Sequence, residues 1–213
     1  MFKPIRWRRF LRDFVVIEAG FVMFGLAIAL MIRANLGTSA WAVLEVALSK
    51  ILGVTPGTMS VMMGVLVLSA GILMKEQIGW GTLANILSIG PWEDLFLWLI
   101  PSVIGNLPLQ ISMLLLAIGL IGLASAVYIG VDAGAGPRDT LMLAIKRKTG
   151  WSVQVARGII EGTVVTLGWL LGGPAGLGTL VFALLVGTSV QVWFKLFKVE
   201  PHAHPAPAVL VED

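Results

Sequence analysis

The segment Arg33-Ala34-Asn35-Leu36-Gly37-Thr38-Ser39-Ala40-Trp41 follows one long apolar run and precedes a short helix-like segment, residues 42–52. A second glycine-rich break, GVDAGAGPR at residues 130–138, has the same position after another long apolar run and precedes residues 139–148. Two similar breaks in similar surroundings indicate an internal repeat.

A shift of about 97 positions superimposes residues 24–95 on residues 121–192 without a gap, and roughly 18 of the 72 positions are then identical. The triplet Gly81-Thr82-Leu83 returns as Gly178-Thr179-Leu180. We interpret the chain as a duplication and its two breaks as the place to look for function. Among the matched glycines are Gly25/Gly122, Gly37/Gly134, Gly53/Gly150, Gly71/Gly168 and Gly90/Gly187.

The composition predicts the fold class. Hydrophobic residues make up 57% of the 213 residues and charged residues only 13%, against about 25% charge in a soluble domain. The mean hydropathy is +0.93. The apolar runs are continuous rather than alternating, which excludes a β-barrel. The sequence therefore predicts an all-α, polytopic helical membrane protein.

Several chemical functions are excluded by the residues that the chain lacks. It has no cysteine and no histidine before the C-terminal tail, which removes thiol chemistry and the usual general base. His202 and His204 in that tail are not interpreted as a metal site. We expect no enzyme activity, no cofactor and no metal site. Most basic residues flank apolar runs, where they orient helices, so nucleic acid is not an expected partner.

Length predicts the topology. Residues 1–13 form a basic tail, residues 14–104 and 105–199 are the two repeats, and residues 200–213 form a Pro-rich tail that we expect to be disordered. The segments after the breaks have about 12 residues, roughly 18 Å, which is too short to cross a bilayer. Each repeat then has three spans and one short helix, and an odd number of spans inverts the second repeat. Eight crossing helices with parallel repeats remain an alternative, because the distribution of Lys and Arg does not separate the two topologies.

The breaks have the chemistry of an anion site. A helix N-terminus has unpaired N–H groups and the positive end of a dipole, and inverted-repeat transporters often place two broken-helix ends around a central site. A charge pair within one of the spans, Arg157 and Glu161, is also among the expected substrate-binding residues. The expected substrate-binding residues are Arg33, Asn35, Gly37, Thr38, Ser39, Asp132, Gly134, Gly136, Arg138, Asp139, Arg157 and Glu161.

A structural interpretation of the same breaks is equally well supported. Glycine in membrane helices often serves close packing, and Thr38, Ser39, Asp132 or Asp139 would then only cap the short helices. Arg33 and Arg138 would lie among lipid headgroups.

Acidic and basic residues within the spans are the other candidates, because they are costly in lipid. Glu18 lies in the first span, and Glu93-Asp94 follow Gly90-Pro91, which we expect to interrupt the span over residues 80–100. Arg157 and Glu161 are four residues apart and can pair on one helix face. We expect this pair inside the bundle, either as a structural ion pair or as a substrate contact or proton relay.

The breaks resemble those of the YczE/YyaS/YitT group of bacterial integral membrane proteins, closest to the YczE type. The matching segments are residues 31–41 (MIRANLGTSAW) and 132–141 (DAGAGPRDTL), together with GGP at 172–174. Where that pattern reads Pro-Trp-Asp, this chain has Ala40-Trp41-Ala42, so only Asp139 of the second repeat keeps the acidic residue. The resemblance implies a bacterial plasma-membrane protein, with no established substrate. We expect both termini in the cytoplasm, from the basic N-tail and from Lys195 and Lys198.

Three functional hypotheses follow. The first is a small transporter or channel for a small polar or anionic solute, bound between the two breaks. The second is a substrate-binding membrane subunit of a larger transporter. The third is a non-transporting regulatory or accessory membrane protein. A central cavity would favour the first two, and a filled interior the third. The expected partners are the lipid bilayer and a small solute, and homo-oligomerisation is left open.

Overall fold

The structure is a computed structural model of the chain, and it describes residues 7–76, 78–134 and 136–199. A single 3-10 turn, Trp7–Arg9, precedes the α-helices. The C-terminal tail expected to be disordered lies outside the described residues, as do residues 1–6 of the basic tail. The helices are α1 (Phe10–Ala34), α2 (Ala40–Leu52), α3 (Pro56–Leu73), α4 (Trp80–Leu99), α5 (Leu107–Ile129), α6 (Pro137–Thr149), α7 (Val153–Leu170) and α8 (Leu177–Phe197).

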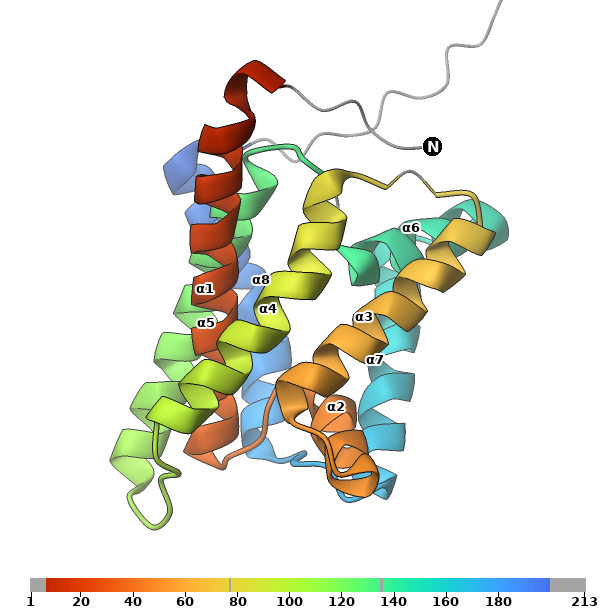
Figure 1. Cartoon of the computed structure of the whole chain (residues 1–213). Helices are drawn as coiled ribbons and strands as arrows, with labels where there is room; N and C mark the ends of the chain where they lie inside the picture. Colours follow the sequence, from red (N-terminus) through yellow and green to blue (C-terminus); the bar gives the residue numbers. More distant parts are fainter. Residues whose placement is uncertain (1–6, 77, 135, 200–213) are drawn as a thin grey trace, which may run out of the picture.

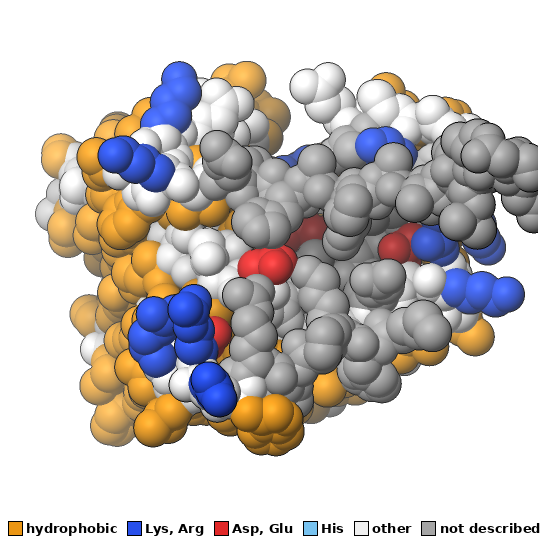
Figure 2. Space-filling view, turned by 90° about the horizontal axis from the view of Figure 1, so that it is seen from above, with side chains coloured by type: hydrophobic (Ala, Val, Ile, Leu, Met, Phe, Trp, Pro, Cys, Tyr) orange, Lys and Arg blue, Asp and Glu red, His pale blue; other side chains and the backbone are white. Residues whose placement is uncertain are grey.

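The two halves of the chain run in opposite senses. In the view of Figure 1, α1 and α4 run downward and α3 runs upward, whereas α5 and α8 run upward and α7 runs downward. The short helix α2 lies at the lower end and the short helix α6 at the upper end. These directions are the ones that an inverted pair of repeats requires, and the two-fold relation itself stays a prediction. Figure 2 shows the upper end, with Lys and Arg side chains spread over it.

The centre of the molecule is the antiparallel pair α1 and α5. Small and aliphatic side chains three or four residues apart on α1 meet a similar row on α5. At the lower end, the buried Gln110 side chain donates hydrogen bonds to Ala34 O (2.7 Å) and Val103 O (3.1 Å), which satisfies a carbonyl at the C-terminus of α1. The buried residues of this core are Ala27, Leu30, Met31, Ala34, Met113, Leu114, Ala117, Ile118, Ile121 and Val186.

Each break binds the first turn of a helix from the other half. The Leu36 carbonyl accepts a hydrogen bond from Gly178 N of α8 (2.7 Å). In the equivalent contact, the Ala133 carbonyl accepts one from Gly81 N of α4 (3.1 Å). A Cβ at Gly37 would lie 2.7 Å from Thr179 Oγ1. The repeated Gly-Thr-Leu triplets are therefore the places where the two breaks pack closely against the starts of α8 and α4.

The short helices pack across the two halves. Helix α2 packs on α7, and α6 packs on α3. A Cβ at Gly168 of α7 would lie 2.6 Å from Leu44 N of α2, and one at Gly71 of α3 would lie 3.0 Å from a methyl carbon of Thr140 in α6. These contacts explain the matched glycines Gly71 and Gly168, because a larger residue would push each short helix away.

Membrane crossing by length and composition is shown for four helices. Among the described residues, the candidate spans are Trp7–Ala34, Pro56–Leu73, Leu107–Ile129 and Leu177–Phe197. Helices α4 and α7 have 20 and 18 residues but carry the intramembrane charged residues. We still expect α4 and α7 to cross the membrane, because both are long enough and both pack against other helices of the bundle. One expected boundary was wrong: Gly90 and Pro91 do not interrupt α4, which is helical throughout.

The two halves differ in one contact. Helices α3 and α4 cross closely, and a Cβ at Gly57 would lie 2.0 Å from Gly90 O. Gly187, which matches Gly90, lies in α8 and has open space around its missing side chain. Helices α7 and α8 do not pack extensively on each other, so this side of the bundle is more open than the α3–α4 side.

Candidate functional site

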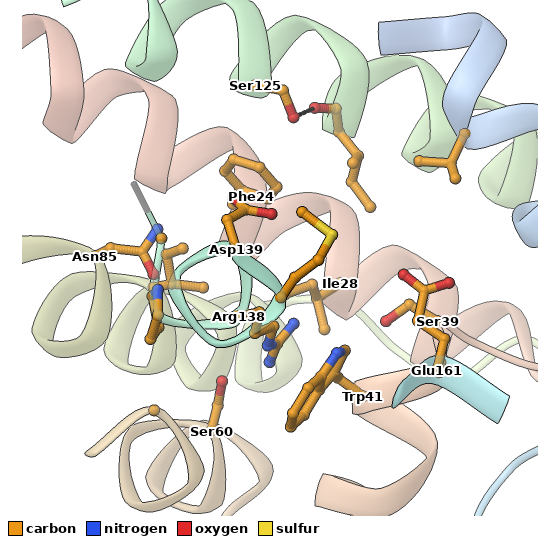
Figure 3. A pocket seen from close by; sticks show the side chains of 18 of the residues that line it. Phe24, Ile28, Ser39, Trp41, Ser60, Asn85, Ser125, Arg138, Asp139 and Glu161 are labelled. Carbon is orange, nitrogen blue, oxygen red and sulfur yellow. Dashed lines mark hydrogen bonds between the residues drawn. The ribbon is translucent and has the colours of Figure 1, made fainter. Parts of the chain in front are cut away.

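A cavity of about 270 Å³ lies between the two halves and is lined by residues of all eight helices. Positions about 97 residues apart recur in its lining, as the repeat would require. Examples are Phe24 with Ile121, Ser60 with Arg157, and Asn85 with Phe182. Figure 3 shows labelled side chains from several helices converging on this space. The cavity therefore lies where a two-fold axis between the halves would pass.

The two short helices begin at the cavity wall. Ser39 is the N-cap of α2 and Gly136 is the N-cap of α6, and both line the cavity. Neither N-cap residue provides a side-chain hydrogen bond to its helix. Ser39 therefore holds the N-cap position without a side-chain capping hydrogen bond. First-turn N–H groups of both helices lie at the cavity without an acceptor from the N-cap side chain, as an anion site needs.

Arg138, in the first turn of α6, is a central side chain of the site. Its Nη2 donates to Glu45 Oε1 of α2 at 2.6 Å, and its guanidinium lies 5.0 Å from the centre of the Trp41 ring. The Arg138 side chain is 36% exposed and that of Glu45 only 1%. Arg138 therefore joins the two short helices while its guanidinium stays accessible from the cavity (Figure 3).

Asp139 is bound on the α5 side of the cavity. Its Oδ2 accepts a hydrogen bond from the Tyr128 hydroxyl at 3.3 Å. Asn85 of α4 also lines this part of the wall. The Asp139 carboxylate thus has a fixed position beside the α6 N-terminus. The cavity therefore offers a hydrogen-bond acceptor close to the Arg138 guanidinium.

The Arg157–Glu161 pair forms as the sequence predicts, with Nε and Oε1 2.8 Å apart. Both residues line the cavity. The two side chains are 52% and 35% exposed, so the pair lies on a cavity wall rather than packed inside the bundle. The expected burial was wrong, because α7 and α8 leave this face uncovered.

The other predicted residues of the first break lie away from the cavity lining. Arg33 donates to the Leu97 carbonyl at the end of α4. Asn35 is the exposed C-cap of α1, with a left-handed φ of 57°. Gly37 is packed against the start of α8, and Thr38 is fully buried. These residues build the turn that positions α2.

Their counterparts in the second break behave alike. Asp132 has the same left-handed φ of 57° as Asn35. Gly134, at φ 136°, is packed against Gly79 and Thr82 at the start of α4. Neither residue is in the cavity lining. The predicted site residues that do line the cavity are Ser39, Gly136, Arg138, Asp139, Arg157 and Glu161.

The intramembrane acids have different environments. Glu18 accepts a hydrogen bond from the Trp92 indole N–H at 2.7 Å. Asp94 accepts one from Gly57 N at 2.8 Å and another from the Thr55 hydroxyl, so it holds the N-terminus of α3. Glu93 is fully buried, and neither of its carboxylate oxygens has a hydrogen-bond partner in the described structure.

Two functional candidates were missed from the sequence. Trp41 was read only as part of the break, yet its ring lies under the Arg138 guanidinium. Glu45 was not singled out, because it lies in a short helix rather than in a full span. Its signal was available: it is the only acidic residue in the mostly apolar segment AWAVLEVALSKIL, and it lies five residues before the exposed Lys50. A buried carboxylate needs a cation, and in the structure Arg138 is bound to it at 2.6 Å.

Comparison with known proteins gives the family. Residues 11–195 match the model of a family of unknown function, DUF6198. The chain belongs to this family. It is 35% identical over 173 residues to the uncharacterized membrane protein YczE of Bacillus subtilis, covering 79% of each chain. It is 32% identical over 183 residues to an uncharacterized protein of Haemophilus influenzae, covering 84% of this chain and 82% of that one.

A third relative is the uncharacterized protein YyaS of Bacillus subtilis, 30% identical over 187 residues, with 86% of this chain and 92% of the relative covered. No solved structure matches the chain. The resemblance to the YczE-type family is confirmed, and with it the membrane location.

Proposed function

We propose that this protein is a small membrane transporter for a small polar solute that carries an anionic group, bound in the cavity at Arg138. The observation that carries the proposal is the meeting of two short-helix N-termini and an accessible guanidinium in one cavity. Each helix N-terminus favours a negative group, and Arg138 adds a full charge with a planar set of donors.

The charges of the lining refine the ligand. Arg138 and Arg157 are balanced by Asp139 and Glu161 in the wall. Such a balanced lining favours a solute with both an anionic and a donor group over a multiply charged anion. In this arrangement the anionic group lies at Arg138 and the α6 N-terminus, and a donor group lies near Asp139.

The unequal packing of the halves supports transport rather than simple binding. Helices α3 and α4 are closed at Gly57 and Gly90, while the equivalent region of α7 and α8 is open. In transporters built from inverted repeats, one half moves against the other around a fixed site. We infer that the second state closes α7 on α8 and loosens α3 from α4.

The test is uptake by proteoliposomes. Purified protein is reconstituted, and uptake of labelled acetate, glycine and inorganic phosphate is compared with that of protein-free vesicles. We expect Arg138→Gln to abolish any protein-dependent uptake, because it removes the cation of the site. Lys146→Gln is the matched control, because Lys146 is exposed near the other end of the same helix.

Equal uptake by both variants would contradict a site at Arg138. A stable association with an ATPase module, with no uptake by the isolated chain, would instead favour a substrate-binding subunit of a larger transporter. The third hypothesis, a non-transporting accessory protein, would be favoured by a filled interior, so the cavity supports it less than the other two.

A further inference from the structure

Two carboxylates are buried inside the helix bundle, and Arg138 is bound to one of them. Glu93 on α4 is 0% exposed and Glu45 on α2 is 1% exposed. Both oxygens of Glu93 and the Oε2 of Glu45 have no hydrogen-bond partner in the described structure. A buried ionised carboxylate without partners is too costly to persist, so this arrangement requires either a proton or another cation.

The two acids flank the same cavity. Glu93 lies one turn beyond Ile89 on α4, and Glu45 lies one turn beyond Trp41 on α2, and both Ile89 and Trp41 line the cavity. Arg138 is bound to Glu45 at 2.6 Å. With both glutamates ionised, Glu45, Glu93 and Arg138 together have a net charge of −1 in an apolar interior.

The neighbouring charged groups are occupied elsewhere. In Glu18 of α1, Oε1 accepts a hydrogen bond from Trp92 while Oε2 is buried without a partner in the described structure. Asp94 holds the start of α3. Asp139 is bound to Tyr128. In α7, Arg157 and Glu161 bind each other. Helix α3, which packs on both α2 and α4, has no charged residue.

We propose that Glu45 and Glu93 form a proton-binding site coupled through Arg138 to the solute in the cavity. In the empty state Glu93 is protonated and Glu45 is ionised against Arg138. An anionic group that binds Arg138 competes with Glu45 for the guanidinium. Glu45 then loses its cation and takes up a proton from water in the cavity, so that one solute anion enters together with one proton.

A metal ion at the same place is less consistent with the residues. Within the described ranges, no group of three or more Asp, Glu or His side chains is placed so that it could hold a metal ion. Alkali and alkaline-earth ions require several oxygen ligands. A proton needs only one carboxylate oxygen.

This inference rests on the proposed function for its coupling, but the acid site can be tested without any transported solute. Infrared difference spectroscopy of protein in lipid nanodiscs detects the carbonyl stretch of protonated carboxylic acids. At neutral pH the wild type is expected to show such a band, and Glu93→Gln to lose it. Asp94→Asn is the matched control and keeps the band, because both carboxylate oxygens of Asp94 already accept hydrogen bonds at the start of α3.

Arg138 variants imitate the step in which the guanidinium leaves Glu45. Arg138→Gln should raise the band about twofold, because both acids are then protonated. Arg138→Lys keeps the charge and should leave the band near its wild-type height. Glu93→Gln protein should fold normally by size-exclusion profile, because glutamine imitates the protonated acid.

Three results would overturn the proposal: no band sensitive to Glu93→Gln in the wild type, misfolding of Glu93→Gln, or loss of the band when NaCl replaces choline chloride. The last result would indicate a sodium site. Absence of solute uptake with the infrared pattern intact would count against the proposed transport function and would leave the acid site standing.

Discussion

At the scale of single residues, the two breaks contain two kinds of position. Ser39, Gly136 and Arg138 line the cavity. Gly37 and Gly134 instead let the backbone pass close to the other half, both with a positive φ. The sequence pattern alone favoured a ligand role for both glycines. In the structure their absent side chains leave room for protein rather than for solute.

Substitution of Gly37 is therefore expected to reduce stability. A Cβ there would lie 2.8 Å from Gly176 N and 2.9 Å from Thr179 N, at a φ of 115°. Gly37→Ala should lose about 1–3 kcal/mol through overpacking and more through backbone strain. Melting in detergent measures this.

Gly53→Ala is the control for that prediction. Gly53 also has a positive φ, 69°, but nothing lies within 4 Å of its missing side chain. This variant has the strain without the collision, so it should melt between the wild type and Gly37→Ala. Equal melting of the two variants would mean that the contact with α8 is not as close as the structure shows.

The partial exposure of the Arg157–Glu161 pair predicts that its loss changes stability only slightly. Glu161→Gln should change the free energy of unfolding by less than about 1 kcal/mol, because a partly exposed pair has water as an alternative partner. Chemical or thermal unfolding in detergent measures it. A loss of several kcal/mol would show that the pair is buried in the membrane form of the protein.

At the scale of helices, α4 contains two neighbouring acids with opposite roles. Asp94 accepts from Gly57 N and the Thr55 hydroxyl at the start of α3, whereas Glu93 has no hydrogen-bond partner among the described residues. Asp94→Ala should cost about 1–3 kcal/mol, because it removes a charged acceptor from a helix N-terminus. Glu93→Gln should cost little or raise the melting temperature. The reverse order in a melting series would contradict both assignments.

The helices were largely predictable from the sequence. Hydropathy and the two breaks indicated every helix of the structure, because a membrane interior requires continuous apolar runs of a fixed length. Two features depended on tertiary contacts instead. Pro91 stays inside a continuous α4, where its own side chain is exposed and the neighbouring Gly90 makes the close crossing with Gly57. Helix α2 packs on α7 and helix α6 packs on α3. The sequence near these helices gives no indication of this packing apart from the matched glycines.

The site was predictable only in part for the same reason. Arg138 and Asp139 were found because they follow a glycine-rich break next to a helix start. Glu45 was missed because its importance comes from Arg138, which is 93 residues away along the chain. A partner across the two halves can be inferred only once the fold has brought α2 and α6 together.

At the scale of the whole molecule, the inverted arrangement predicts the sidedness of equivalent positions. The chain has no cysteine, so single cysteines can be placed at exposed positions near the ends of the short helices. Ile51→Cys in the α2 end and Lys148→Cys in the α6 end should react with a membrane-impermeant reagent from opposite faces of intact cells. Labelling of both from one face would exclude the inversion.

We propose above that the cavity between the two short helices holds a small solute at Arg138. An experimental density map of the protein, purified from membranes without added ligand, tests this proposal. We predict compact density within hydrogen-bonding distance of the Arg138 guanidinium and the first amides of α6, absent from Arg138→Gln protein prepared in parallel. An acyl chain threaded through the cavity, or a cavity closed by side chains, would contradict the claim.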